Sequence, residues 1–480
     1  MRNPSNGIIR VCTHHRTTRA PIACATSSAA SPSPSPPPPS TAYPRLLLQW
    51  LEENGATQEN VTIQSVIREG VEVDVTVANR PLVPGDLALR IPESLIVTLD
   101  RVFEGDGPLS ELLTANKLSE LAVLTLYLMY EKKKRKESFF YPLIKELDRL
   151  GGRGPQGAKS PLLWDEGQAE ALLAGSPTVG MIKERLRGIR KEYEELDTVY
   201  YMSGNLFRSY PFEVPSEQFS VDQFIQAFAA IQSSIVHLQG VTLTKRFALV
   251  PMGPPLLPYS STSKALLQYN AEQKTVELRV EREYAAGESV VTWCGPQPNS
   301  RLLINYGVVD EGNPYDKLPL AVIIPSDDPL YRKKRSRLAE HDLSTQQTFQ
   351  LSVNNFLPPT ILPYLRLTFA TSEDELWKVQ FDVKGSGGAA PVSPANEAKV
   401  LATLSAHLQR RLSEYKTTVE EDAAIIADPT TGPRQTVASK LLRIEKKILQ
   451  GALAQVMRQP GAAEAIASGA AVGSAGVKFV

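Results

Sequence analysis

Segments with the alternation of β-strands lie on either side of a long stretch with the period of an α-helix. Val71–Ala78 alternates apolar and polar side chains at a period of two, and residues 265–270 and 275–280 flank a polar turn. Between these segments, leucines repeat on one helical face over residues 121–128. This order predicts an α+β fold of small β-sheets with a helical insertion at about residues 105–240.

Helices are expected again after residue 316. The helical period is clearest over residues 395–415 and 438–457. A glycine-rich linker is expected at residues 385–390. The last stretch, residues 459–480, is rich in alanine and glycine and is expected to be flexible.

The overall composition argues against several classes of partner. The 52 Lys and Arg residues are balanced by 52 Asp and Glu residues, which removes the broad basic field that attracts nucleic acid. The cysteines Cys12, Cys24 and Cys294 lack zinc-ligand spacing, so no metal site is expected. No apolar stretch approaches the length of a membrane span, so no membrane association is expected.

The first residues have the composition of an import signal. Residues 1–50 contain no Asp or Glu, and they carry five arginines among many Ser, Thr and Ala residues. A Ser-Pro and Pro run at residues 31–39 favours a disordered or polyproline-like chain. We therefore expect residues 1–42 to be a disordered transit peptide. The alternative is a disordered tail that carries no address.

One string near the end of the second β-rich segment is unusually specific. Residues 299–309 read N-S-R-L-L-I-N-Y-G-V-V, and residues 313–316 read N-P-Y-D. The string resembles the SET methyltransferases of the plant Rubisco large-subunit type, whose pattern is N-x-x-L-L-x-x-Y-G-F followed by N-P-x-D. Residues 415–422 and 443–449 are similar to the helical substrate-binding domain of that family. The resemblance covers nearly all of residues 43–458.

The resemblance implies a SET domain over residues 43–316 and an all-α substrate-binding domain over residues 317–458. That second domain docks a protein substrate or partner. The implied reaction is methyl transfer from S-adenosylmethionine (AdoMet) to a lysine amine of a chloroplast protein. Such a transfer depends chiefly on positioning, because the neutral amine must lie in line with the methyl–sulfur bond at near-attack distance.

The same resemblance assigns the candidate site residues. Tyr306 takes the place of the catalytic tyrosine at the end of the lysine channel. The positions implied for cofactor binding are Val75, Ser234, Pro258 and Tyr259, and those implied for substrate binding are Cys294 and Val308. The alternative for Tyr306 is a core tyrosine, preserved because Gly307 lets the backbone turn sharply.

The cofactor segment departs from the family pattern. The family reads V-P-x-x-D-x-x-N-H-S, whereas Pro254, Leu257 and Pro258 stand here at the Asp, Asn and His positions. Proline has no N–H to offer to the adenine. Ser234 replaces an arginine that would hold the cofactor carboxylate in a charge-assisted pair, and β-branched residues such as Val75 stand where the backbone should approach the cofactor.

Two functions follow from these patterns. The first is an AdoMet-dependent protein-lysine N-methyltransferase acting on a plastid protein. The second is a catalytically silent SET-fold scaffold that binds a protein in the plastid through its helical domain. Cofactor binding discriminates between them.

Overall fold

The computed structural model describes residues 42–58, 60–68, 71–104, 118–151, 160–165, 167–202, 220–381, 390–468 and 478–479. The predicted transit peptide, apart from Ala42, and the predicted linker, apart from Ala390, lie outside these residues. Within the described ranges, no helix has both the length and the apolar character needed to cross a membrane.

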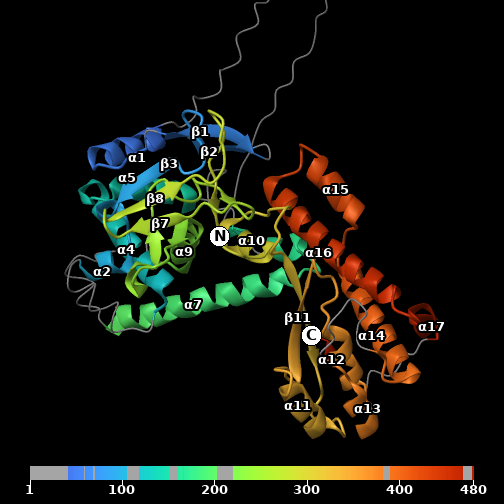
Figure 1. The fold of residues 1–480 in the computed structure, drawn as a ribbon. Helices are drawn as coiled ribbons and strands as arrows, with labels where there is room; N and C mark the ends of the chain where they lie inside the picture. The colour runs from blue at the N-terminus through green and yellow to red at the C-terminus, as the bar shows by residue number, and fades with distance from the viewer. Residues whose placement is uncertain are drawn as a thin grey trace, which may run out of the picture. The chain divides into compact units, whose positions relative to one another are not determined.

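The N-terminal part contains the small sheets that the sequence predicts (Figure 1). Helix α1 (Ala42–Glu53) precedes the antiparallel pair β1 (Val61–Arg68) and β2 (Val71–Ala78). A second sheet has the order β3-β8-β7. Its strands are β3 (Leu87–Pro92), β7 (Leu267–Asn270) and β8 (Thr275–Arg279). Two shorter pairs join β4 (Ile235–His237) to β5 (Phe247–Leu249), and β6 (Tyr259–Ser260) to β9 (Thr292–Trp293).

A helical block lies between β3 and β4, as the sequence predicts. Its helices are α2 (Leu99–Phe103), α4 (Glu120–Lys134), α5 (Tyr141–Gly151), α6 (Gln168–Leu172), α7 (Thr178–Met202) and α9 (Val221–Ser234). Serine caps begin two of them, because the Ser119 and Ser220 hydroxyls accept backbone N–H groups of the first turns of α4 and α9. The last helix, α9, packs against α4 and α5 and ends directly in β4.

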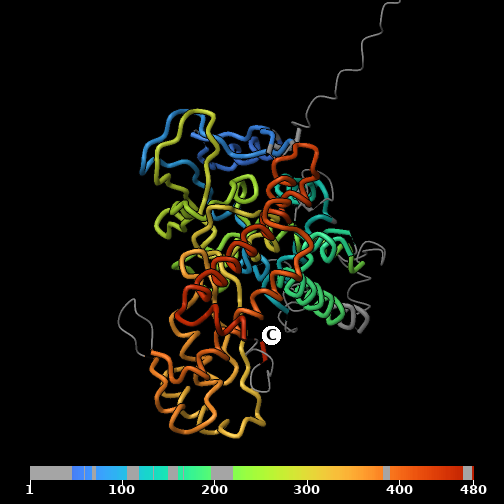
Figure 2. The backbone as a smooth tube through the Cα atoms, turned by 90° about the vertical axis from the view of Figure 1, so that its right-hand side faces the viewer, coloured from blue at the N-terminus to red at the C-terminus, as the bar shows by residue number. Residues whose placement is uncertain are grey.

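The C-terminal part is mainly helical. Its helices are α11 (Tyr331–Ala339), α12 (Ile361–Thr368), α13 (Glu373–Lys378), α14 (Pro394–Ser413), α15 (Val419–Ala427), α16 (Pro433–Met457) and α17 (Ala462–Ala467). Both α14 and α15 pack along α16 (Figure 1, Figure 2). Proline at the first turn of α14 and of α16 suits a helix start, because proline lacks the N–H that would go unpaired there.

The expectation of an all-α C-terminal domain needs one correction. Strands β10 (Lys317–Ile323) and β11 (Gln346–Ser352) pair over their whole length, and β12 (Lys478–Phe479) joins the other edge of β10. Strand β10 alternates between exposed and buried side chains, but its sequence, K-L-P-L-A-V-I, is apolar at nearly every position and shows no clear period of two. The tail expected to be flexible also contributes α17 and β12.

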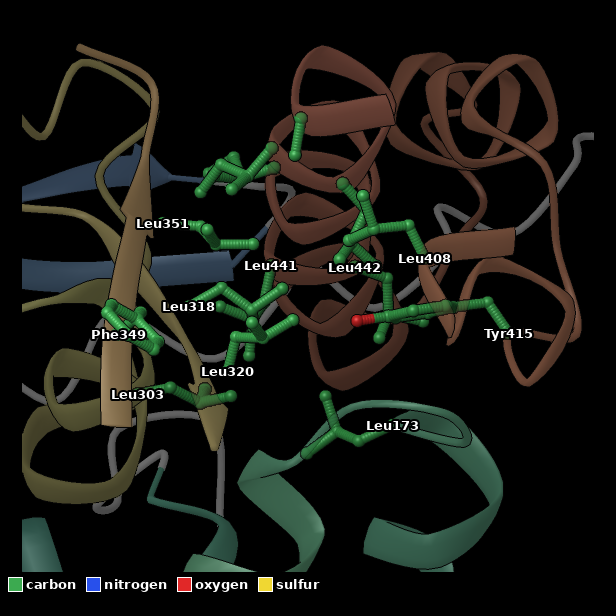
Figure 3. Close-up of a cluster of buried hydrophobic side chains, with 14 of the residues drawn as sticks. Leu173, Leu303, Leu318, Leu320, Phe349, Leu351, Leu408, Tyr415, Leu441 and Leu442 are labelled. Carbon is green, nitrogen blue, oxygen red and sulfur yellow. The ribbon is translucent and has the colours of Figure 1, made fainter. Parts of the chain in front are cut away.

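A continuous hydrophobic cluster crosses the predicted domain boundary at residue 316. Leu303 lies before that boundary and is fully buried in the same cluster as Leu318 and Leu441, which lie after it. Figure 3 shows these leucines side by side with Leu173 of the segment that follows α6. Burial of each such side chain contributes about 1.5–3 kcal/mol. The helical insertion, the Tyr306 string and the C-terminal part are therefore held together by one core.

A buried carboxyl group lies within this junction. Glu445 of α16 is 5% exposed, and its carboxylate accepts hydrogen bonds from Ser176 at 2.9 Å and from the Tyr415 hydroxyl at 3.0 Å. The other charged groups that face it are Asp316 and Arg411. Burial raises the pKa of Glu445 to about 7, with Asp316 adding to the rise and the hydrogen bonds opposing it.

Because of this buried carboxyl group, we expect the free energy of unfolding to fall as pH rises toward neutrality. The ordinary glutamate pKa is 4.5, so folding favours the protonated form, and that contribution is lost as pH rises from about 4.5 through 7. The free energy of unfolding will fall by roughly 3 kcal/mol or less across this window because of Glu445. Denaturant unfolding at a series of pH values will show the slope in the wild type, and Glu445→Gln will flatten it. An unchanged slope in the variant would show that other carboxyls dominate.

Candidate active site

The helix that carries Tyr306 is fixed at its start by a buried asparagine. Helix α10 (Asn299–Tyr306) begins at Asn299, which is fully buried. The Asn299 side-chain amide donates to Asp316 Oδ2 at 2.7 Å and to the Asp310 carbonyl at 2.8 Å, and Asn299 Oδ1 accepts the Asp310 N–H at 2.8 Å. Burial raises the pKa of Asp316, while its hydrogen bonds with Asn299 oppose the rise. The N-x-x-L-L string and the N-P-x-D string are thus joined by direct contacts.

Removal of this amide will destabilise the fold. Asn299→Ala leaves the buried Asp316 carboxylate and the Asp310 backbone without these partners, and each unsatisfied buried group costs roughly 1–3 kcal/mol. We expect the free energy of unfolding to drop by about 2–3 kcal/mol in urea titrations. Arg301→Ala, at an exposed position of the same helix, serves as the control and will change it by less than about 0.5 kcal/mol. Equal values for the two variants would refute the role of Asn299.

At the C-terminal end of α10, the ring of Tyr306 packs against the ring of Tyr259. Gly307 ends the helix in the left-handed conformation at a φ of 67°. The rings of Tyr306 and Tyr259 are tilted by 51°, with 4.4 Å between their centroids. Tyr259 lies in β6, and its hydroxyl donates to the Ile235 carbonyl at 3.2 Å. Three segments of the chain therefore meet at Tyr306: α10, β6 and the end of α9.

Both tyrosines are partly buried. Burial raises the pKa of Tyr259 well above its usual value, and the neighbouring Tyr306 adds to the rise. Burial also raises the pKa of Tyr306, while the nearby Gln297 and Tyr259 side chains oppose that rise. Both phenols stay neutral near pH 7. Tyr306 can accept or donate a hydrogen bond there, but it is not a base.

Cys294 and Gln297 complete this cluster. Burial raises the pKa of the Cys294 thiol to about 11, which keeps it neutral and unreactive at pH 7. The Gln297 side-chain amide donates to the Cys294 carbonyl at 2.7 Å, and its Oε1 accepts from Asn305 Nδ2 at 3.3 Å. Sequence reasoning missed Gln297, because it lies outside the quoted family string. Its place between Pro296 and Pro298, just before the α10 helix, is the only local signal.

The cofactor-side candidates are placed around the same segments. Ser234 is the last residue of α9, directly before Ile235, and its buried hydroxyl donates to the Ala230 carbonyl at 2.8 Å. Pro258 directly precedes Tyr259, and its carbonyl accepts the Thr292 N–H at 2.9 Å. Val75 is 2% exposed in β2. The next residue along β2 donates its N–H to the Leu256 carbonyl of the cofactor segment at 2.7 Å.

The substrate-side candidates divide into one inner and one outer residue. Cys294 belongs to the tyrosine cluster, since its thiol contributes to the raised pKa values of both Tyr259 and Tyr306. Val308 lies two residues beyond Tyr306 and is 38% exposed, so it stands at the surface next to the cluster. The structure thus brings Tyr306, Tyr259 and Cys294 together. It places Pro258 directly before Tyr259 and Ser234 directly before Ile235, and it puts Val308 at the rim.

The residues at the tyrosine cluster fit the reactive end of AdoMet. The Tyr306 hydroxyl, the Tyr259 hydroxyl and the Ile235 carbonyl supply neutral oxygens, which suit a sulfonium methyl group. The carboxylate end of AdoMet would have to be held by neutral groups, because Ser234 bonds its own helix and Pro258 has no N–H. Loss of one charge-assisted contact costs about 1.5–3 kcal/mol. We therefore expect weak rather than absent cofactor binding.

Comparison with known proteins agrees with this arrangement. Residues 325–449 match the family model described as Rubisco LSMT substrate-binding. Among solved structures, the SET domain of LSMT bound to lysine and AdoHcy matches with a TM-score of 0.68 and 20% sequence identity, over 89% of this chain and 93% of that chain. Rubisco LSMT bound to AdoMet matches with the same TM-score, over 88% of this chain and 93% of that chain.

Curated relatives point the same way. The actin-histidine N-methyltransferase of Xenopus tropicalis is 26% identical over 427 residues, which are 85% of this chain and 68% of that protein. The actin-histidine N-methyltransferase of Mus musculus is 25% identical over 425 residues, which are 85% of this chain and 67% of that protein. The shared fold, the Tyr306 string and the matching C-terminal part lead to one assignment. The chain has the fold of the LSMT SET-domain structures, its residues 325–449 match the Rubisco LSMT substrate-binding family, and it is similar over most of its length to SET-type methyltransferases of this kind.

Proposed function

We propose that this chain is an AdoMet-dependent protein-lysine N-methyltransferase that acts on a plastid protein. The observation that carries the proposal is the tyrosine cluster at the end of α10, where Tyr306 is held against Tyr259 beside the Ile235 carbonyl. The C-terminal part would bind the protein substrate, as the Rubisco LSMT substrate-binding match indicates. Both parts share one core, so a docked substrate would be held at a fixed position relative to Tyr306.

Cofactor binding and methyl transfer test the proposal together. Calorimetry with the full chain will detect AdoMet binding in the micromolar to millimolar range, because the charge-assisted contact at Ser234 is absent. Radiolabelled AdoMet added with plastid protein extract will label a protein band, and mass spectrometry will place the methyl group on lysine. No detectable heat at millimolar AdoMet would contradict the enzyme proposal.

The acceptor residue needs its own readout, because the curated relatives are actin-histidine methyltransferases. A lysine amine is a flexible, slender acceptor, whereas the imidazole of histidine is a planar ring. The packed pair of Tyr259 and Tyr306 favours the slender acceptor on steric grounds. A methyl group found on histidine would keep the methyltransferase proposal and overturn the choice of lysine.

The plastid location is a separate proposal. It is supported by the absence of acidic residues and the scattered arginines in residues 1–50. A fusion of residues 1–42 to a fluorescent protein should enter the chloroplast stroma. Diffuse cytosolic fluorescence would contradict a transit peptide and leave the enzymatic proposal untouched.

A catalytically silent scaffold in the plastid is the second candidate. The observation that favours it is the cofactor segment, where Ser234 and Pro258 supply neither a cation nor an N–H. Such a protein would bind its plastid partner through the C-terminal part without methylating it. Binding of a plastid protein that persists unchanged with and without AdoMet, together with no cofactor heat, would select this candidate.

A further inference from the structure

A carboxylate joins the segment that follows β6 to the string that carries Tyr306. Asp310 Oδ2 accepts the Ser261 N–H at 3.0 Å and the Ser261 hydroxyl at 2.6 Å. Hydrogen bonds to an ionised acceptor are shorter and stronger than those between neutral groups. Ser261 is 3% exposed, so water competes little for its two donors. Ser261 is therefore tied to Asp310 through both its backbone and its side chain.

Asp310 is in turn fixed to the start of α10. Its backbone N–H and its carbonyl are both bonded to the Asn299 side chain, at 2.8 Å each. Its Oδ1 accepts the Gly312 N–H at 3.1 Å, which sets the orientation of the carboxyl group. A shift of Ser261 would therefore require a shift of a carboxylate that Asn299 and Gly312 hold in place.

These bonds bear on the tyrosine cluster because Tyr259 and Tyr306 belong to the two segments that they join. Tyr259 lies two residues before Ser261, and Tyr306 lies four residues before Asp310. Two residues of chain span no more than about 7 Å, so a displaced Ser261 would carry Tyr259 with it. The ring contact, at 4.4 Å between centroids, would then change. A misplacement of about 1 Å at a reacting group can slow a reaction roughly 100-fold.

We propose that Asp310 is a positioning residue for methyl transfer, because its carboxylate holds Ser261 and thereby sets the packing of Tyr259 against Tyr306. The inference rests on the proposed function, since it concerns the same two tyrosines. Asp310 would act through the two rings and would not contact AdoMet or the target amine. Loss of the Ser261 hydroxyl should therefore slow the transfer step and leave cofactor affinity nearly unchanged.

The test compares Ser261→Ala with Ser263→Ala in the full chain. Both variants lose a buried hydroxyl from the segment after β6, but the Ser263 hydroxyl bonds locally, to the Ala265 N–H at 3.1 Å. The chain is labelled with carbon-13 at the Cζ of tyrosine, and the Tyr259 and Tyr306 resonances are identified by their loss in the corresponding phenylalanine variants. Both resonances will shift in Ser261→Ala and will keep their wild-type positions in Ser263→Ala.

Methyl transfer is measured on the same variants, with labelled AdoMet and with plastid protein extract as the acceptor. The rate of label transfer will fall by roughly fivefold to tenfold in Ser261→Ala, because one charge-assisted hydrogen bond is lost. The AdoMet Kd of this variant will stay within about twofold of the wild type. Ser263→Ala will keep the wild-type rate.

The outcomes separate this inference from the proposed function. Unmoved tyrosine resonances in a folded Ser261→Ala protein overturn the inference, and so does equal slowing in Ser263→Ala. If Ser261→Ala does not fold, Ser261→Cys replaces it, because the thiol fills the site and donates only a weak hydrogen bond to Asp310. If the wild type transfers no label, the proposed function fails and the inference fails with it. A wild type that transfers label no faster than Ser261→Ala overturns the inference alone.

Discussion

Replacement of Tyr306 by phenylalanine will lower the rate of methyl transfer by roughly 100-fold or more, while the AdoMet Kd stays within about twofold. The substitution removes one oxygen and keeps the ring. The ring contact with Tyr259, at 4.4 Å between centroids, can therefore persist and keep the site packed. What is lost is the oxygen that would accept the N–H of the target amine. Single-turnover assays with labelled AdoMet and calorimetry on the same samples measure the two quantities.

A matched tyrosine elsewhere controls for the loss of a hydroxyl. Tyr331 of α11 has its hydroxyl at 3.1 Å from the Thr345 hydroxyl, away from α10, β6 and the end of α9. Tyr331→Phe will leave the transfer rate and the AdoMet Kd at their wild-type values. An unchanged transfer rate in Tyr306→Phe would show that Tyr306 is a core tyrosine, preserved for the turn at Gly307.

The string around Tyr306 is the strongest signal in the sequence because two of its residues have a local structural task. Asn299 joins the two strings through Asp310 and Asp316, and Gly307 supplies the left-handed turn. Such tasks depend on residue type and spacing, which a sequence displays directly. The α+β fold and the helical insertion could be predicted for a related reason, since periodicity records which faces are buried.

Two features could not be read from the sequence. The hydrogen bonds of Gln297 with Cys294 and Asn305 depend on how the chain turns between two prolines, and no period or motif encodes that turn. Strands β10 and β11 are separated by 22 residues, 324–345, so their pairing is a contact between distant segments that no local pattern encodes. Pro319 within β10 also obscured its strand pattern, because proline is unusual inside a paired strand.

The second large effect concerns a buried ion pair between the first turn of α15 and the middle of α16. The side chains of Lys446 in α16 and Asp422 in α15 are 3% and 0% exposed, and they form a salt bridge. The Lys446 ammonium also donates to the Thr417 carbonyl at 2.6 Å and to the Thr418 carbonyl at 2.9 Å. Thr418 begins α15 with a capping box, so this pair ties the start of one helix to the middle of the other.

Asp422→Ala will lower the free energy of unfolding by about 3–5 kcal/mol, because it leaves the Lys446 ammonium buried without its counter-charge. Glu420→Ala, which removes an exposed carboxylate from the same helix, will cost less than about 1 kcal/mol. Lys446→Met in the Asp422→Ala background will recover part of the loss, since an uncharged pair no longer requires compensation. Denaturant unfolding of the wild type, Asp422→Ala, Lys446→Met and the double variant gives a double-mutant cycle for the pair, with Glu420→Ala measured beside it as the control. If Asp422→Ala and Glu420→Ala lowered the free energy of unfolding equally, the Lys446 ammonium would have to be hydrated after the loss of Asp422. That result would contradict the role of the ion pair.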